Sequence, residues 1–161
     1  MKLSEYMLSV GTKARAAADE LLKTPSDKKN LALSAIRNSI IENKTKLLTA
    51  TDIDLNVGEK KGLDDASLDR LRLTENSIDM ILHGLNQIEA LPDPIGNMEQ
   101  VSYRPNGLQI GRMRVPIGVI GIIYESRPNV TVDAAALCLK SGNSVSSFFA
   151  NSKSKKSSIT Q

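Results

Sequence analysis

Residues 117–124, with the sequence Ile-Gly-Val-Ile-Gly-Ile-Ile-Tyr, constrain the fold of this chain more than any other segment. The run is almost entirely apolar and rich in β-branched residues, which is typical of a strand covered on both faces in a parallel sheet. Residues 130–140 predict the crossover helix, and residues 141–143 (Ser-Gly-Asn) predict its C-cap. Ser144 and Val145 should begin the next parallel strand. We therefore expect a strand–turn–helix–strand unit of an α/β fold.

The polar turn between that strand and that helix is the strongest candidate for a binding site. In open α/β sheets, ligands bind beyond the carboxyl ends of the strands, beside helix N-termini whose free N–H groups favour anions. Arg127 offers a bidentate contact to phosphate or carboxylate, and Glu125 either joins the site or forms a salt bridge with Arg127. Ser126 and Asn129 either bind a ligand or cap the helix. The turn thus predicts an anion site built from these side chains.

Helical patterns fill residues 1–91. Residues 3–23 carry an apolar stripe at alternating steps of four and three. A second helix is expected with Thr24 as its N-cap and Pro25 at its first position, reaching about residue 48. Residues 51–61 predict a short third helix, and another begins after Thr74 and ends at the prolines that follow Leu91. The apolar residues expected on the inner faces are Leu33, Ile36, Ile40, Leu47, Ile78, Ile81, Leu82, Leu85 and Ile88.

Residues 97–124 have the character of strands rather than helices. An Asn-Gly pair, Asn106 and Gly107, lies between two extended runs, a pattern that favours a β-hairpin. Together with the helices before it and the parallel unit after it, this predicts a mixed α/β architecture: helices first, then a hairpin, then the start of a parallel sheet.

Composition excludes several classes of function. Without the three lysines of residues 146–161, basic and acidic side chains balance at 18 each, so no basic surface for nucleic acid is expected. No apolar run approaches the length of a membrane span, so no membrane partner is expected. A single cysteine, Cys138, forms no internal disulfide and suits a reducing compartment, and we therefore expect a cytoplasmic protein. The only histidine, His83, has no second histidine or cysteine cluster beside it, so no metal site is expected.

Residues 146–161 differ in character from everything before them. Six of these sixteen residues are serine, against eleven in the preceding 145, and a strand that needs apolar residues is replaced at its middle by Ser-Ser-Phe-Phe. We interpret the segment as a disordered, out-of-frame ending. The alternative is an ordinary disordered tail, which its Ser- and Lys-rich composition permits.

Residues 114–133 (Arg-Val-Pro-Ile-Gly-Val-Ile-Gly-Ile-Ile-Tyr-Glu-Ser-Arg-Pro-Asn-Val-Thr-Val-Asp) and 137–143 (Leu-Cys-Leu-Lys-Ser-Gly-Asn) closely resemble γ-glutamyl phosphate reductase, a member of the aldehyde dehydrogenase superfamily. Residues 62–74 and 91–96 resemble the same family, so the resemblance extends over residues 1–145. It implies that these residues form part of a Rossmann-like cofactor-binding domain that is truncated in this chain. Residues 146–161 then lie outside it, where the family continues with an Ile-Leu-Arg-Gly-Gly-like strand.

The resemblance implies NADPH-dependent reduction of L-glutamate 5-phosphate to glutamate 5-semialdehyde and phosphate, through a cysteine thioester, in proline biosynthesis. Asn129 is a candidate for the side chain that stabilises the oxyanion. In the family the nucleophilic cysteine lies far downstream, in a domain that this chain lacks, and Cys138 between two leucines is expected to be a small buried residue. We therefore expect no activity from the 161 residues alone. The alternative is a non-enzymatic fragment or a helical interaction module. The resemblance also implies that the full-length enzymes of the family can form oligomers.

Overall fold

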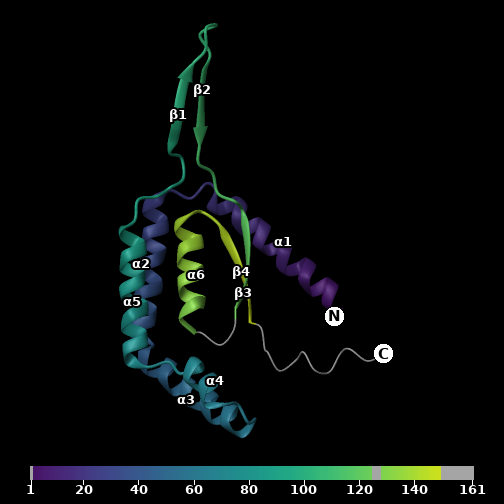
Figure 1. The fold of residues 1–161 in the computed structure, drawn as a ribbon, viewed down its shortest axis with the longest axis vertical. Coiled ribbons are helices and arrows are strands. Elements are labelled where there is room, and N and C mark those ends of the chain that lie inside the picture. The colour runs from purple at the N-terminus through teal and green to yellow at the C-terminus, as the bar shows by residue number, and fades with distance from the viewer. Residues whose placement is uncertain (1, 125–127, 150–161) are drawn as a thin grey trace.

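The computed structural model describes residues 2–124 and 128–149, and it confirms the expected mixed α/β class (Figure 1). The helices are α1 (Leu3–Leu21), α2 (Ser26–Glu42), α3 (Lys44–Lys60), α4 (Asp65–Leu71), α5 (Glu75–Ala90) and α6 (Pro128–Lys140). The strands are β1 (Met98–Tyr103), β2 (Gln109–Met113), β3 (Val119–Tyr124) and β4 (Ser144–Phe149).

Three helices, α2, α5 and α6, lie side by side and enclose the core (Figure 1). The buried cluster contains Leu33 from α2, Ile81, Leu85 and Ile88 from α5, and Ala136 from α6. The predicted inner face of α5 is confirmed, because its apolar residues recur at the spacing of one helical face and become buried together. Each fully buried aliphatic side chain stabilises the folded state by about 1.5–3 kcal/mol, so this cluster is the main source of cohesion in the body.

The crossover unit is also confirmed: β3 and β4 pair in parallel, from Val119 opposite Ser144 to Tyr124 opposite Phe149. α6 lies between this sheet and α2 and α5, while α1 crosses the other side of the sheet (Figure 1). The hydroxyl of Ser144 donates a 2.7 Å hydrogen bond to the carbonyl of Ala14 and so ties the sheet to α1.

The end of α6 has the C-cap that the sequence predicts. Gly142 adopts a φ of +69°, and its N–H donates to the carbonyl of Leu139 at 3.1 Å while the N–H of Asn143 donates to Cys138 at 2.8 Å. This pair of bonds is the Schellman arrangement. The side-chain oxygen of Asn143 also accepts a 2.8 Å bond from the N–H of Gly118, so the cap fixes the entry to β3 as well.

The hairpin is confirmed too, and it projects away from the body (Figure 1). β1 and β2 pair antiparallel, with Met98 opposite Met113. The N–H of Arg104 donates to the carbonyl of Leu108 at 2.8 Å across the turn, where Gly107 adopts a φ of +85°. Every residue of both strands is exposed.

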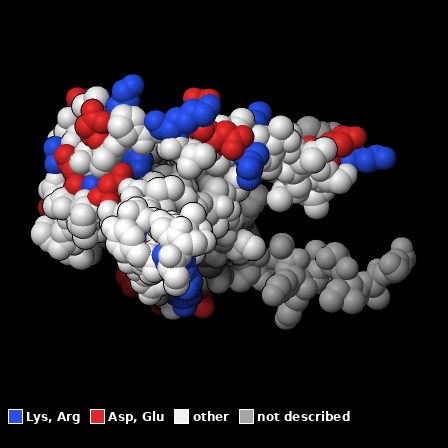
Figure 2. All heavy atoms as spheres, turned by 90° about the horizontal axis from the view of Figure 1, so that it is seen from above, with Lys and Arg blue, Asp and Glu red and all other residues white. Residues whose placement is uncertain are grey.

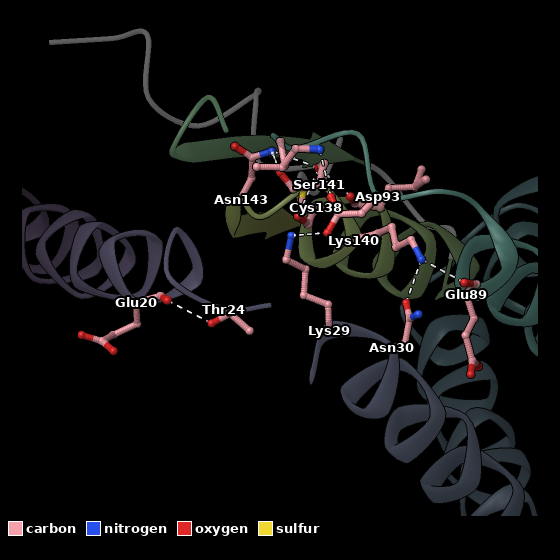
Figure 3. Close-up of polar contacts among 12 residues, drawn as sticks. Glu20, Thr24, Lys29, Asn30, Glu89, Asp93, Cys138, Lys140, Ser141 and Asn143 are labelled. Carbon is pink, nitrogen blue, oxygen red and sulfur yellow. Dashed lines mark hydrogen bonds and ion pairs between the residues drawn. The ribbon is translucent and has the colours of Figure 1, made fainter. Parts of the chain in front are cut away.

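The predicted helix boundaries are wrong at two places near α2. The N-cap of α2 is Pro25 rather than Thr24, whose hydroxyl instead donates a 2.9 Å bond to the Glu20 carbonyl at the end of α1 (Figure 3). α2 ends at Glu42 rather than about residue 48, because Asn43 leaves the helical region and its amide donates to the Ser39 carbonyl at 2.8 Å. An asparagine side chain that bonds the backbone in this way competes with helix continuation.

The third helix consequently starts earlier than expected and contains Leu47, and the short helix α4 was not predicted at all. α4 has its own N-cap, because the Asp64 carboxylate accepts a 3.0 Å bond from the N–H of Ser67. Of the apolar stripe predicted for α1, Ala14 is buried, whereas Ala17 is exposed and Leu3 is 77% exposed; the other buried residue of this helix, Ala18, lies one position beside the stripe.

Two expectations for the sheet also differ from the structure. β3 is not covered on both faces: exposed and half-buried residues alternate along it, and Ile123 is 75% exposed. In the described part of the chain β3 pairs with β4 alone, and α1 and α6 lie mainly against β4, which leaves residues of β3 exposed. β4 continues through Phe149, four residues past the predicted boundary at 145, because ladder hydrogen bonds use backbone groups that Ser146 and Ser147 supply as well as apolar residues would.

Candidate functional site

A pocket of about 340 Å³ lies where the first turns of α5 and α6 meet the end of α4. Its polar lining consists of Arg70, Arg72, Ser77, Asn129 and Asp133. The two arginines come from α4 and the linker after it, Ser77 from α5, and the other two from α6. Segments more than fifty residues apart in the sequence therefore build one site.

The apolar lining of the pocket connects it to the core. Leu73, Met80, Ile81 and Pro128 form this part of the wall. Ile81 is only 6% exposed and belongs to the buried cluster, and Leu73 packs against that cluster. Close-packed protein interiors have low compressibility, so we expect the floor of the pocket to be rigid.

Two helix N-termini contribute to the electrostatics of the pocket. α5 begins after its N-cap Thr74, whose hydroxyl oxygen accepts a 3.1 Å bond from the N–H of Ser77 and lies 2.8 Å from the Ser77 hydroxyl. α6 begins at Pro128, which itself lines the pocket. The partial positive charge of each N-terminus favours a negative ligand group.

The two arginines add full positive charges. Within the described residues, neither Arg70 nor Arg72 has an acidic partner within 4.0 Å, and both are exposed at the pocket. Hydrogen bonds from Ser67, and to a smaller degree the charge of Arg70, lower the pKa of Asp64. Asp64 serves as the N-cap of α4, and no ion pair within 4.0 Å joins it to either arginine, so both guanidinium groups are available to a ligand.

Of the sequence-predicted site residues, Asn129 lines this pocket and is exposed in the first turn of α6. Glu125, Ser126 and Arg127 lie outside the described residues. Sequence reasoning missed Arg70, Arg72, Ser77 and Asp133 as site residues. The arginines stand within residues 62–74, one of the segments that carry the family resemblance, which was the only signal that could have drawn attention to them.

Cys138 lies away from the pocket lining and is 6% exposed. Burial raises the pKa of its thiol, which keeps it protonated and unreactive. His83 is exposed on α5. Across the described ranges, no group of three histidine, cysteine or acidic side chains is placed to hold a metal ion.

Buried amines hold the helices that carry the pocket walls (Figure 3). Lys140 of α6 is 4% exposed and donates to the side-chain oxygen of Asn30 in α2 at 2.7 Å and to the Glu89 carbonyl in α5 at 2.9 Å. Lys29 of α2 is 3% exposed and pairs with Asp93 at 2.7 Å. The Lys140 bonds tie the C-terminal end of α6 to α2 and α5, and the Lys29 pair ties α2 to the segment that follows α5.

The surface shows no concentration of one charge on the face seen in Figure 2, where basic and acidic side chains are interspersed. Such a surface offers no extended track for a polyanion. Among the described residues, no helix combines the length and the apolar character that crossing a bilayer requires.

The solved structures that this chain resembles include two γ-glutamyl phosphate reductases, while no protein-family model matches the sequence. γ-Glutamyl phosphate reductase from Thermotoga maritima superposes with a TM-score of 0.85 and 38% identity, over 89% of this chain and 34% of that enzyme. The Saccharomyces cerevisiae enzyme of the same name gives a TM-score of 0.84 and 29% identity, over 89% of this chain and 36% of that one. The chain thus spans about a third of the length of either enzyme. The matches confirm the resemblance that the sequence motifs indicate: this chain has the fold of part of a γ-glutamyl phosphate reductase.

Proposed function

We propose that this chain is part of an enzyme that reduces L-glutamate 5-phosphate to L-glutamate 5-semialdehyde and phosphate, using NADPH, in cytoplasmic proline biosynthesis. The observation that carries the proposal is the match to the Thermotoga maritima reductase, with a TM-score of 0.85 and 38% identity over 89% of the chain. The pocket at the start of α6 supports it, because two arginines and two helix N-termini suit an acidic substrate of small size.

In this proposal Asn129 donates a hydrogen bond from its side-chain amide to the oxygen that becomes negative when the acyl group is attacked. Its exposed place in the first turn of α6 leaves the amide open to the pocket. Glu125, Ser126 and Arg127 precede Pro128 in the sequence, and we propose that they contact the substrate or the cofactor.

The residues described here fit only part of a dinucleotide. They form one parallel β–α–β unit, β3–α6–β4, whereas a dinucleotide is held across two such halves of a longer sheet. We therefore propose that productive NADPH binding requires the longer protein of which the relatives are examples, and we assign no step of the reaction to the cofactor in this chain.

The 161 residues alone are proposed to be inactive, because their one thiol, Cys138, is buried and protonated rather than activated. Purified chain mixed with NADPH and L-glutamate 5-phosphate should leave the NADPH absorbance unchanged. Turnover above the rate without protein would contradict this part of the proposal.

The family activity is tested with a chimera. The segment of the Thermotoga maritima reductase that superposes on this chain is replaced by residues 3–143, and reduction of L-glutamate 5-phosphate is followed through NADPH consumption. We expect turnover that depends on Asn129: Asn129→Ala should lower kcat about a hundred-fold, the magnitude typical of removing one oxyanion donor.

The matched control is Asn106→Ala in the hairpin turn, which should leave kcat unchanged because the hairpin projects from the end of the molecule opposite to α4 and contributes no residue to the pocket lining (Figure 1). A chimera that folds but shows no turnover, while its parent enzyme is active under the same conditions, would contradict the proposed function. That result would favour the alternative of a non-enzymatic fragment or a helical interaction module.

A further inference from the structure

We propose that the pocket between α4, α5 and α6 recognises the α-amino-acid end of the substrate, with Arg70 and Arg72 receiving its carboxylate and Asp133 its ammonium group. The identity of the substrate rests on the proposed function. The site itself rests on the residues that line the pocket.

The carboxylate half of this assignment follows from the positive charges. Arg70 and Arg72 both line the pocket, and neither is paired with an acid among the described residues. The N-termini of α5 and α6 add partial positive charge at the same place. A guanidinium group binds a carboxylate with two parallel hydrogen bonds, which fixes the orientation of the ligand as well as its affinity.

Asp133 supplies the ammonium half and distinguishes this pocket from a general anion site. It is half-buried in the pocket wall and has no basic partner within 4.0 Å in the described part of the chain. A purely anionic ligand would be repelled by this carboxylate, since like charges at close range oppose binding. A zwitterion, by contrast, matches the arginines with one group and Asp133 with the other.

The spacing along α6 agrees with the shape of a glutamyl chain. Asn129 and Asp133 are four residues apart, so they share one face of the helix and are separated by about 6 Å along its axis. In a glutamyl group two methylenes separate the α-carbon from the acyl carbon. Asp133 is thereby placed to hold the α-ammonium group while Asn129 faces the reacting acyl group.

The apolar lining suits those methylenes. Leu73, Met80 and Ile81 give the pocket an uncharged surface between its polar ends. The volume of about 340 Å³ falls at the small end of the range of roughly 300–1,000 Å³ for small-molecule sites, as expected for an amino acid derivative rather than a nucleotide.

The direct test is a titration of the isotopically labelled 161-residue chain, followed by the backbone amide signals of Ser77, Asn129 and Asp133 in two-dimensional NMR. Three probes are compared: L-glutamate, glutarate, which lacks the amino group, and inorganic phosphate. We expect these signals to move with L-glutamate, with a dissociation constant about ten-fold lower than for glutarate, the size of one charge-assisted hydrogen bond. No movement with any probe, or phosphate binding as tightly as L-glutamate, would overturn the proposal.

Substitutions separate the two halves of the assignment. Arg70→Gln and Arg72→Gln should each weaken L-glutamate and glutarate binding about ten-fold, and Arg72→Lys should recover part of that loss. Asp133→Asn should remove the preference for L-glutamate over glutarate without weakening glutarate. Arg112→Gln, an exposed arginine on β2, is the control and should change nothing. Unchanged signals outside the pocket show that each variant is folded, and equal binding by all variants would contradict the assignment.

Kinetics of the chimera provide a second readout that keeps this inference separate from the proposed function. Arg72→Gln should raise KM for L-glutamate 5-phosphate about ten-fold and leave kcat within a few-fold, as loss of uniform binding does. If the chimera is active and substitutions at Arg70, Arg72 and Asp133 leave its kcat and KM unchanged, the inference is contradicted while the proposed function stands. If the 161-residue chain binds L-glutamate selectively but the chimera is inactive, the assignment of the pocket stands and the proposed function is contradicted.

Discussion

The helical body and the β1–β2 hairpin hold their structures by different means. In the body, Leu33, Ile78 and Leu85 are at most 1% exposed, and the helices that carry them are joined by contacts between distant residues. In the hairpin every residue is exposed, and the strands are held by the ladder and by a turn of a few residues. A change in the body therefore acts on the whole fold and on the pocket, whereas a change in the hairpin acts locally.

Matched leucine substitutions should show the largest contrast. Leu85→Ala removes a fully buried side chain from the core and should lower the free energy of unfolding by about 2–5 kcal/mol. Leu108→Ala removes the same atoms from a hairpin residue that is 56% exposed. This variant should change the free energy of unfolding by less than about 0.5 kcal/mol. Urea denaturation of both variants measures the difference. Equal losses would mean that the hairpin shares the stability of the body.

Matched ion pairs should give the next largest effect. Asp93→Asn removes the carboxylate from the buried Lys29, leaving one weaker hydrogen bond, and should lower the free energy of unfolding by about 1–3 kcal/mol. Glu99→Gln breaks the exposed 2.8 Å pair with Arg114 in the hairpin, for which about 0–1 kcal/mol is expected. The same denaturation experiment applies, and a larger loss in the hairpin variant would contradict the comparison.

The buried pair should also make stability depend on pH. Burial alone would raise the pKa of Asp93, but hydrogen bonds from Lys29 and the Ile95 N–H, with the charge of Lys29, outweigh it and lower the pKa below 3.8. A carboxyl with a lowered folded-state pKa stabilises the fold fully above its ordinary value, and that contribution is lost as the pH falls through the folded-state pKa. Thermal melting from pH 6 downward should show a melting temperature that declines below about pH 4, and Asp93→Asn should reduce that decline.

Matched glycine substitutions should give the smallest of these effects on global stability. Gly142 and Gly107 both have positive φ, where an alanine is strained by about 1–2 kcal/mol. A Cβ on Gly142 would also lie 3.1 Å from Pro116, whereas one on Gly107 would meet nothing within 4 Å. Gly142→Ala should therefore lower the melting temperature of the body, and Gly107→Ala should only increase opening of the hairpin turn. A global loss from Gly107→Ala matching that from Gly142→Ala would argue against independent regions.

The same contrast explains which elements the sequence predicts. The Asn-Gly turn, the N-cap Thr74 and the C-cap Gly142 depend on a few adjacent residues, so local patterns identify them. The break at Asn43 depends on which backbone carbonyl its side chain bonds, and the pattern of apolar residues carries no such information.

The candidate site was predictable only where one segment supplies it. Asn129 stands in the strand–turn–helix unit that the sequence singles out, and the structure places it in the pocket. Arg70 and Arg72 reach the same pocket because α4 and its linker end beside α5 and α6, an arrangement set by tertiary packing. Spacing within the sequence cannot reveal two segments that meet only in the folded chain.

The most direct test of this account measures amide hydrogen exchange across the 161-residue chain. The central claim is that α2, α5 and α6 form one packed unit that positions the pocket, while the hairpin takes no part in it. The account predicts that the amides of these three helices exchange slowest and that their most protected amides share one opening free energy. The amides of β1 and β2 should exchange much faster. Hairpin amides as protected as those of α5, or independent exchange of α6 from α5, would contradict it.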